Sequence, residues 1–171
     1  TGFIWDNVLL HGLSFRNYGE MSTTEPVPKD AGWLAIYQDY RTNGNKISFQ
    51  HDMQVETLRR YSCPQSPGWN MRIPDAIRAD VFLNEFTEHE KKGEWPNLVI
   101  IYLPSDHTSG PRPGSPTPRA QVADNDLAVG RIIERISKSR FWPKSCIFVN
   151  EDDPQAGFDH VDGHRSLCLV V

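Results

Sequence analysis

The sequence predicts an α/β fold with a mostly parallel sheet, and three segments support this prediction. Residues 98–103 (LVIIYL) form a continuous apolar run between Pro96 and Pro104, which is typical of a strand buried on both faces. Residues 119–138 show helical spacing of apolar residues, and residues 146–150 (CIFVN) form a second apolar run that predicts a buried strand. The order strand, helix, strand predicts a βαβ unit, in which the two strands run parallel.

Two further helices are predicted because apolar residues recur on one face of each. Residues 3–11 form the first, which stops before Gly12. Residues 75–92 form the second, which follows Pro74 and ends at Gly93. The residues expected to face inward in the three helices are Ile4, Trp5, Val8 and Leu9, then Ile77, Val81, Phe82 and Phe86, then Val122, Leu127, Ile132, Ile133 and Ile136.

The remaining segments are less regular. Residues 13–20 (LSFRNYGE) predict a short strand. Residues 21–70 are polar, rich in proline and aromatic residues and weakly periodic, so we expect loops and small elements there, as an insertion beside a site. The stretch from Asn150 to Ser166 has no helical pattern, although a parallel crossover normally contains a helix. The last strand, which begins near Ser166, is therefore expected to run antiparallel to the strand before it.

Composition and charge bound the classes of protein that fit. The 171 residues are 38% hydrophobic and 23% charged, which suits one domain or a large piece of one. The net charge is −4 without a long basic run, so a nucleic-acid partner is not indicated, and no apolar stretch is long enough to span a membrane. Cys146 and Cys168 lie in apolar runs and are expected to be buried free thiols, whereas Cys63 lies in a proline-rich loop without an evident partner.

The two ends of the sequence suggest a piece of a larger protein. The chain begins with Thr1 rather than methionine, carries no signal-like segment, and stops at Val171 within an apolar run. We therefore expect a fragment of a longer parent protein. The missing signal peptide then says nothing about where the parent works, and the sequence does not indicate an oligomeric state.

Carboxylates and imidazoles gather in two loops, each of which follows a predicted strand. The loop SDHTSG brings Asp106 and His107 after the first strand. Because parallel strands place their carboxyl ends at one edge of a sheet, both loops would leave from the same edge. The antiparallel last strand would begin at that edge too. The side chains of the second loop are Glu151, Asp152, Asp153, Asp159, His160, Asp162 and His164.

This set of side chains predicts a metal site. Like charges repel, so the cluster destabilises the fold unless a cation lies within it. Carboxylates and imidazoles without cysteine suit Mg, Mn, Ca, Fe or Zn, and more ligands are present than one ion needs. Two divalent metal ions a few ångströms apart suit phosphoryl transfer, because they hold the phosphate oxygens and stabilise the attacking and leaving oxygens.

Simpler interpretations exist for each feature. An Asp-rich loop with Gly and Pro is often a solvated turn, and a single His is more often structural than a ligand. The loop at residues 109–119 can be a PxxP ligand for an SH3-like partner or simply a loop at the edge of the site. Arg16 and Arg78 are candidates for anion binding, or else charges of the surface or of a helix. The aromatic residues interpreted as packing are Trp5, Trp33, Tyr37, Tyr40 and Trp69.

Two long motifs carry a family resemblance. Residues 103–142 (LPSDHTSGPRPGSPTPRAQVADNDLAVGRIIERISKSRFW) and 147–165 (IFVNEDDPQAGFDHVDGHR) closely resemble the bacterial phosphoesterase family of the alkaline phosphatase superfamily. That family includes phospholipase C-type enzymes and acid phosphatases. Residues 3–20 (FIWDNVLLHGLSFRNYGE) and 63–86 (CPQSPGWNMRIPDAIRADVFLNEF) are similar to further segments of the family. The resemblance implies a three-layer α/β/α sandwich with a mostly parallel sheet. Residues 1–171 would be its carboxyl-side part, with an insertion at about residues 21–70.

The resemblance also implies a two-metal phosphatase site. One ion takes an Asp and a His after one strand and a His just before a late strand, and Asp106, His107 and His164 match those places. The second ion takes acidic or His ligands after the next strand, where Asp152 and Asp153 stand. The members of the motif to which the resemblance gives no definite role are Asp159 and His160.

The family's nucleophile segment is not found in this sequence. Its Ser or Thr nucleophile and an Asp or Asn ligand lie near the amino end of the domain, so we expect both upstream of residue 1. The parent is then expected to be a metal-dependent phosphoric ester hydrolase, periplasmic or secreted as in the family, and this chain alone to be inactive. Its phosphate-ester substrate can be a monoester, a diester or a phospholipid. The alternatives are a non-catalytic divalent-metal-binding domain, and a truncated domain that neither binds tightly nor reacts.

Overall fold

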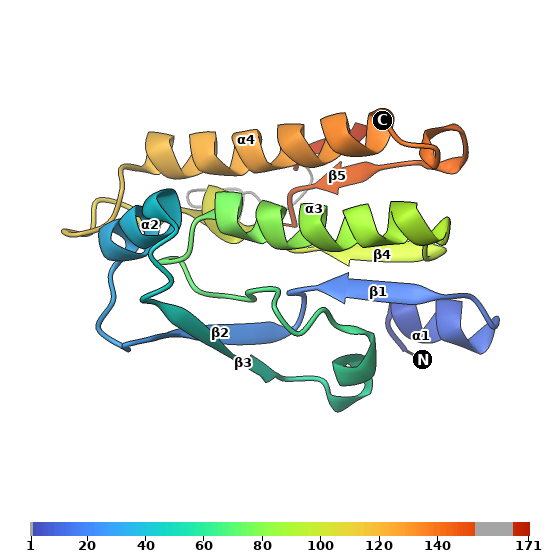
Figure 1. Ribbon diagram of the computed structural model, residues 1–171, viewed down its shortest axis with the longest axis horizontal. Coiled ribbons are helices and arrows are strands. Elements are labelled where there is room, and N and C mark those ends of the chain that lie inside the picture. The colour runs from blue at the N-terminus through green and yellow to red at the C-terminus, as the bar shows by residue number, and fades with distance from the viewer. Residues whose placement is uncertain (1, 153–165) are drawn as a thin grey trace. The chain divides into compact units, whose positions relative to one another are not determined.

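The computed structural model describes residues 2–152 and 166–171, and the fold is mixed α/β (Figure 1). The chain divides into two compact units, residues 1–132 and residues 133–171. The elements that begin in the first unit are α1 (Ile4–Leu10), β1 (Phe15–Tyr18), β2 (Ser22–Val27), α2 (Trp33–Thr42), β3 (Ser48–Met53), η1 (Glu56–Tyr61), α3 (Asp75–Lys92), β4 (Leu98–Ile101), η2 (Pro104–His107) and α4 (Pro118–Ser137), where η marks a 3-10 helix.

A small parallel sheet forms within the first unit. Strands β1 and β4 pair in parallel, with Phe15 opposite Leu98 and Tyr18 opposite Ile101. The predicted strands at residues 13–20 and 98–103 are thus confirmed, and they pair in parallel with each other, a pairing that the sequence did not predict. The side chains of β4 are half-buried throughout, however, so the expectation of a strand buried on both faces is wrong for the described chain.

Helix α3 packs on this sheet, and its predicted inward face is confirmed at the aromatic positions. Phe82 and Phe86 are fully buried, and the ring of Tyr18 on β1 meets the ring of Phe82 edge-on at a centroid distance of 5.1 Å. Figure 1 shows α3 running alongside β4. The helix ends where predicted, because Gly93 takes the left-handed conformation, with φ of 76°, that glycine adopts without strain.

Helix α1 closes one end of the core by packing its apolar stripe. Trp5 is buried against Phe15 and Leu58, and Val8 and Leu9 pack beside them, as predicted. Ile4 was expected on the same face but is 61% exposed. The short helix offers room for only one fully buried anchor, and Trp5 fills it.

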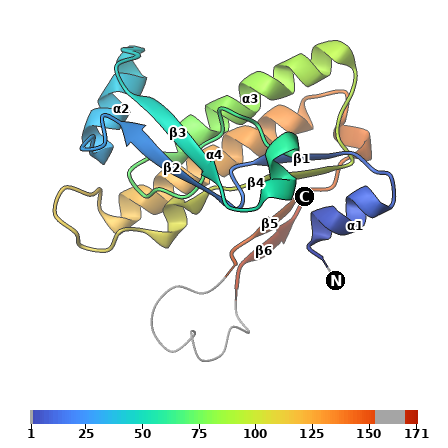
Figure 2. The ribbon, with the colours of Figure 1, turned by 90° about the horizontal axis from the view of Figure 1, so that it is seen from below.

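The segment at residues 21–70 is more regular than expected. Strands β2 and β3 pair antiparallel over six residues each, with α2 between them in the chain (Figure 2). We call this strand pair the β2–β3 hairpin and residues 21–70 the hairpin region. The inward positions of β2 are Ser22, Thr24 and Pro26, none of which gives a hydrophobic signal. Hydrogen bonds satisfy these buried hydroxyls instead: the Thr24 hydroxyl accepts from the N–H of Gly68 at 2.8 Å. Polar strands of this kind escape a prediction that depends on apolar alternation.

The inward face of α4 differs from the predicted one. Val122 and Leu127 were expected inside but are 47% and 57% exposed, whereas Ala128 and Ile132 are buried as a helical stripe requires. In its first turns the buried or half-buried face carries polar residues at helical spacing: Gln121, Asp124 and Asn125. The first turns of α4 therefore contact the rest of the first unit through hydrogen bonds rather than apolar packing.

The second unit contains the end of α4, η3 (Trp142–Lys144) and two short strands, β5 (Phe148–Asn150) and β6 (Cys168–Val170). These strands pair antiparallel, which confirms the predicted direction of the last strand. Cys146 and Cys168 are exposed and Phe148 is 63% exposed, so their predicted burial is wrong. In these two three-residue strands Val149 is half-buried and the other residues are exposed. Among the strand pairings of the described residues, β4 pairs with β1 and β5 with β6, so the βαβ pair expected across residues 119–138 is not found.

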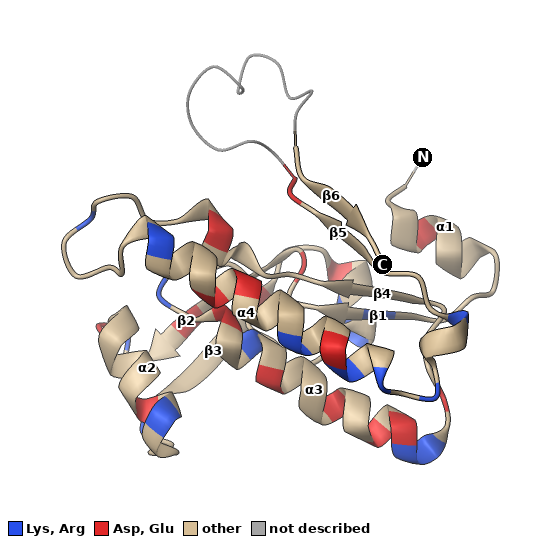
Figure 3. Cartoon of the chain, turned by 90° about the horizontal axis from the view of Figure 1, so that it is seen from above, with Lys and Arg blue, Asp and Glu red and all other residues tan. Residues whose placement is uncertain are grey.

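The distribution of charged residues and the hydropathy of the helices fit the mixed composition of the sequence. Acidic and basic residues are interspersed along α3 (Figure 3). No helix within residues 2–152 and 166–171 has the length and apolar character that crossing a membrane requires. The buried thiol is Cys63, and burial together with a hydrogen bond to Glu85 raises its pKa to about 11.

Candidate functional site

The Asp106–His107 pair lies where the sequence predicted, in the turn that follows a parallel strand. The turn η2 (Pro104–His107) begins three residues after the end of β4. Asp106 is half-buried and His107 is exposed, so the imidazole is accessible from solvent. The carboxyl end of a parallel strand is where α/β sheets place their ligands, which makes this turn the candidate site.

The ring of His107 has a defined tautomer. Its Nδ1 lies 3.0 Å from the carbonyl oxygen of Thr108. A carbonyl only accepts hydrogen bonds, so Nδ1 is the donor of this bond, and in the neutral imidazole the lone pair is then on Nε2. An imidazole fixed through Nδ1 to a backbone carbonyl is the usual arrangement for binding a metal through Nε2.

Thr108 adopts a strained backbone to make this contact. Its φ is 60° and its ψ is 164°, a region that β-branched residues rarely enter. Such outliers persist only where the surrounding structure holds them, and they concentrate at functional sites. The strain turns the Thr108 carbonyl back toward the imidazole of the preceding residue.

Replacing this strained threonine tests the cost of the arrangement. Thr108→Gly should raise the free energy of unfolding by about 1 kcal/mol, because the relieved strain exceeds the added entropy of the unfolded chain. Urea unfolding measures the change. The matched control is Thr23→Gly in β2, which removes a threonine from a paired strand and should lower stability by about 0.5–1 kcal/mol. A loss of stability in Thr108→Gly equal to the control would contradict the assigned strain.

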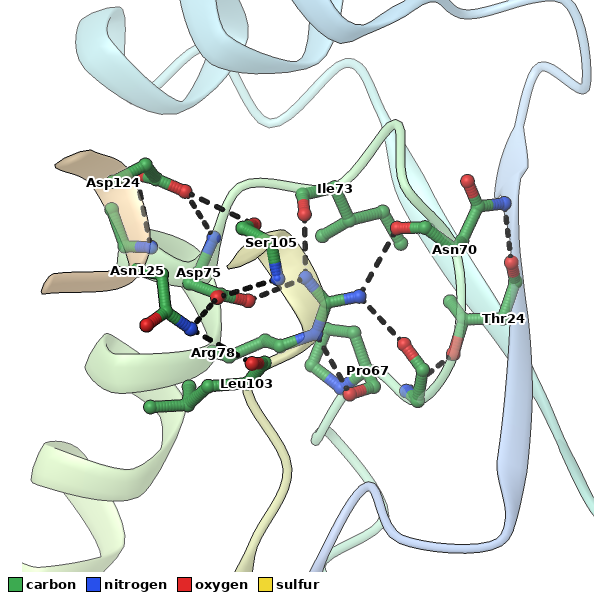
Figure 4. Close-up of polar contacts among 12 residues, drawn as sticks. Thr24, Pro67, Asn70, Ile73, Asp75, Arg78, Leu103, Ser105, Asp124 and Asn125 are labelled. Atoms are coloured by element: carbon green, nitrogen blue, oxygen red, sulfur yellow. Dashed lines mark hydrogen bonds and ion pairs between the residues drawn. The ribbon is translucent and has the colours of Figure 1, made fainter. Parts of the chain in front are cut away.

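A buried network of an ion pair and hydrogen bonds fixes the backbone that leads from the end of β4 into the η2 turn (Figure 4). Asp75 and Arg78, at 0% and 1% exposure, pair at 3.0 Å in the first turn of α3. The Asp75 carboxylate accepts the backbone N–H of Ser105 at 2.9 Å and the side-chain amide of Asn125 at 3.0 Å. Asn125 also donates to the carbonyl of Leu103 at 2.8 Å. The backbone on the amino side of Asp106 is therefore fixed by α3 and α4 together.

Helix α4 also fixes the backbone on the other side of the turn. Gln121 accepts the N–H of Ser109 at 2.7 Å through its side-chain oxygen. The three residues between Ser105 and Ser109 thus span two anchored points. The polar inward face of α4 is explained by this task, because apolar residues could not hold the two backbone segments.

Asp124 supplies the cap that α3 lacks. The residue before the helix is Pro74, whose side chain has no acceptor, and the Asp124 carboxylate instead accepts the N–H of Asp75 at 2.6 Å and of Ala76 at 3.4 Å. Burial and, less strongly, the nearby charge of Asp75 raise the pKa of Asp124, although the backbone hydrogen bonds oppose the shift. A carboxylate at this position caps α3, but burying its charge costs solvation free energy.

The raised pKa predicts a pH dependence of stability. Because the folded protein holds the Asp124 proton more tightly than the unfolded chain, this residue's contribution is favourable at low pH. It is lost as pH rises from about 3.8 through the folded-state pKa. Asp124→Asn should therefore flatten the change in unfolding free energy between pH 4 and 7, measured by urea unfolding. Asp126→Asn, at an exposed position of the same helix, is the control, and an equal flattening there would contradict the assignment.

An aromatic side chain from the hairpin region reaches the same turn. The ring of Trp69 meets the ring of His107 at a centroid distance of 4.9 Å and an interplanar angle of 83°. Trp69 is 38% exposed, so it is only partly a packing residue, contrary to the sequence interpretation. Residues 21–70 thus contribute directly to the surroundings of His107.

The other predicted ligands are not assembled by the described structure. Asp152 is exposed and follows β5 in the second unit. Asp153, Asp159, His160 and His164 lie outside the described residues, and the convergence of all these side chains stays a prediction. In residues 2–152 and 166–171, no group of three or more His, Cys, Asp or Glu side chains is placed to hold a metal ion. The carboxylate and imidazole of Asp106 and His107 fit a divalent ion chemically, but they supply fewer than the usual three or four ligands.

The sequence interpretation missed the residues that support the turn. Arg78 was interpreted as a surface or helix charge and is instead buried in an ion pair. Pro74-Asp75 was recognised as a helix start, but the tertiary role of Asp75 has no local signal. The polar residues at helical spacing in α4 were the one available clue.

Comparison of the chain with models of known protein families, with curated proteins and with solved structures finds no match.

Proposed function

We propose that this chain is the carboxyl-side part of a metal-dependent phosphoesterase of the alkaline phosphatase superfamily, acting on phosphate esters. The observation that carries the proposal is the His107 arrangement: an exposed imidazole after a parallel strand, whose Nδ1 donates a hydrogen bond to the Thr108 carbonyl. Its neighbour Asp106 adds a carboxylate. This pair matches the Asp–His position in the family motif.

The proposed site takes its remaining ligands from the second loop. Asp106, His107 and His164 would hold one divalent ion, and Asp152 and Asp153 the second, with Asp159 and His160 nearby in sequence. The ions would neutralise the phosphate oxygens and stabilise the charge that develops during transfer. The contribution of the described residues is to hold Asp106 and His107 through anchored backbone on both sides. The nucleophile, a Ser or Thr, would come from upstream of residue 1.

The proposal also includes a larger parallel sheet than the two strands described. A parallel sheet is normally covered on both faces, and the two-stranded β1–β4 sheet would be a small part of such a sheet. The half-buried side chains of β4 and the α3 cover agree with one outer layer of a three-layer α/β/α sandwich. Completion of the sandwich belongs to the proposal.

One observation bears on whether Ser14 could serve as the nucleophile of the chain by itself. Ser14, a conceivable nucleophile within the chain, bonds to Asn97 at 2.8 Å at the amino ends of β1 and β4. The η2 turn follows the carboxyl end of β4. Ser14 therefore lies at the wrong edge of the sheet to attack a phosphate held by His107.

Coupling between metal and phosphate distinguishes the two functions. Inorganic phosphate, titrated calorimetrically, should bind the chain in the presence of Zn²⁺ and not in its absence, and each should raise the affinity of the other by the same factor. Zinc binding that phosphate does not change would favour the non-catalytic domain. No zinc binding at millimolar concentration would contradict both functions.

A further inference from the structure

We propose that Trp69 is a positioning residue for His107, holding the imidazole in the orientation that presents Nε2 to a bound ion. This inference rests on the proposed function. It assigns a role in the site to Trp69, which the sequence analysis interpreted as a packing residue. The argument depends on the contact between the rings and on how firmly each ring is held.

The two rings meet in a geometry that restricts rotation of the imidazole. A centroid distance of 4.9 Å and an interplanar angle of 83° place them edge to face, an arrangement that aromatic pairs favour. The bond from Nδ1 to the Thr108 carbonyl restrains the same ring at one atom. A hydrogen bond alone still permits the ring to swing about it, and the indole blocks that motion.

The backbone of Trp69 is itself fixed by strand β2. Its N–H donates to the carbonyl of Ser22 at 2.8 Å, and its carbonyl accepts from the N–H of Thr24 at 3.1 Å. The next residue, Asn70, donates through its side chain to the carbonyl of Thr24 at 2.7 Å. The indole therefore projects from a backbone that is bonded like a third strand of the hairpin.

The buried guanidinium of Arg78 contacts both the segment that leads to Trp69 and the carboxylate that anchors the His107 turn. Arg78 donates to the carbonyls of Pro67 at 3.3 Å and Gly68 at 2.6 Å, on the segment that leads to Trp69 (Figure 4). It also pairs with Asp75, whose other oxygen holds the N–H of Ser105 in the His107 turn. The relative position of indole and imidazole is therefore set by a network in the interior, not by the rings alone.

Such preorganisation should appear as metal affinity. An imidazole that is already oriented loses less side-chain entropy when it binds, and removing groups that orient a ligand typically costs about 10–100-fold in affinity. We expect Trp69→Ala to weaken Zn²⁺ binding by about tenfold. Trp69→Phe keeps an aromatic edge and should stay close to the wild type.

A spectroscopic measurement without metal tests the contact itself. The protein contains five Trp, so 5-fluorotryptophan labelling gives separable ¹⁹F signals, and the Trp69 signal is the one missing from Trp69→Phe. His107→Ala should shift this signal, whereas His11→Ala, at the exposed end of α1, should not. An unchanged Trp69 signal in His107→Ala would overturn the inference.

A calorimetric zinc titration then separates this inference from the proposed function. The variants are Trp69→Ala, Trp69→Phe and the control Trp33→Ala, which removes a tryptophan that stacks on Tyr37 in α2. Affinity lost in Trp69→Ala and retained in the other two supports the positioning role. Equal affinity in wild type and Trp69→Ala overturns that role alone, while a wild type that binds no zinc overturns the proposed function and the role together.

Discussion

Replacing Arg78 by methionine should lower the free energy of unfolding by about 3–5 kcal/mol. The substitution keeps much of the side-chain volume but leaves the carboxylate of Asp75 buried without its partner, which is the costly way to break a buried ion pair. It also removes the donors to the carbonyls of Ile73 at 2.5 Å and Gly68 at 2.6 Å. Urea unfolding followed by circular dichroism measures the loss.

A matched ion pair nearer the surface provides the control. Arg131 pairs with Asp80 between α4 and α3, and both side chains are 34% exposed. Because solvent screens such a pair, Arg131→Met should cost less than about 1 kcal/mol. Similar losses in the two variants would show that burial of the Arg78 network does not decide its contribution.

Divalent metal should stabilise the chain by about 2.7 kcal/mol at a concentration one hundred times its dissociation constant. The predicted ligand loop places several carboxylates close together in sequence, and a cation that binds only the folded state offsets their repulsion. Urea unfolding with increasing Zn²⁺ or Mn²⁺ measures the gain. Because the proposed site takes further ligands from upstream of residue 1, the gain should require millimolar metal. Stability independent of metal up to that concentration would contradict the prediction.

Helices α1, α3 and α4 and strands β1 and β4 could be predicted because apolar periodicity reports burial directly, but the pairing of β1 with β4 could not. Trp5, Phe82 and Phe86 were placed correctly on this basis. The β2–β3 hairpin could not be predicted, because its buried residues Ser22 and Thr24 are polar. The hydrogen bonds that satisfy their hydroxyls leave no pattern in the local sequence. Periodicity also misplaced Val122, because the adjacent Gln121 has a hydrogen-bonding task that outweighs hydrophobicity on that face.

The candidate site was predictable only in part, for a similar reason. Asp106 and His107 are adjacent in sequence and follow a recognisable strand, so local reasoning found them. Their supports come from distant segments: Asp75 lies thirty residues before Ser105, and Trp69 reaches His107 from the hairpin region. Contacts of that kind follow from tertiary packing, which a single sequence does not encode in any short motif.

The measurement that tests the central claim most directly is Zn²⁺ affinity, by calorimetry, in wild type, His107→Ala, His164→Ala and the control His11→Ala. If the chain carries part of a phosphoesterase metal site, the wild type and His11→Ala should bind alike. His107→Ala and His164→Ala should each lose at least about tenfold in affinity, because each removes a ligand of the same ion. Equal affinity in all four proteins would contradict the account, since the η2 turn and the second loop would then have no common metal.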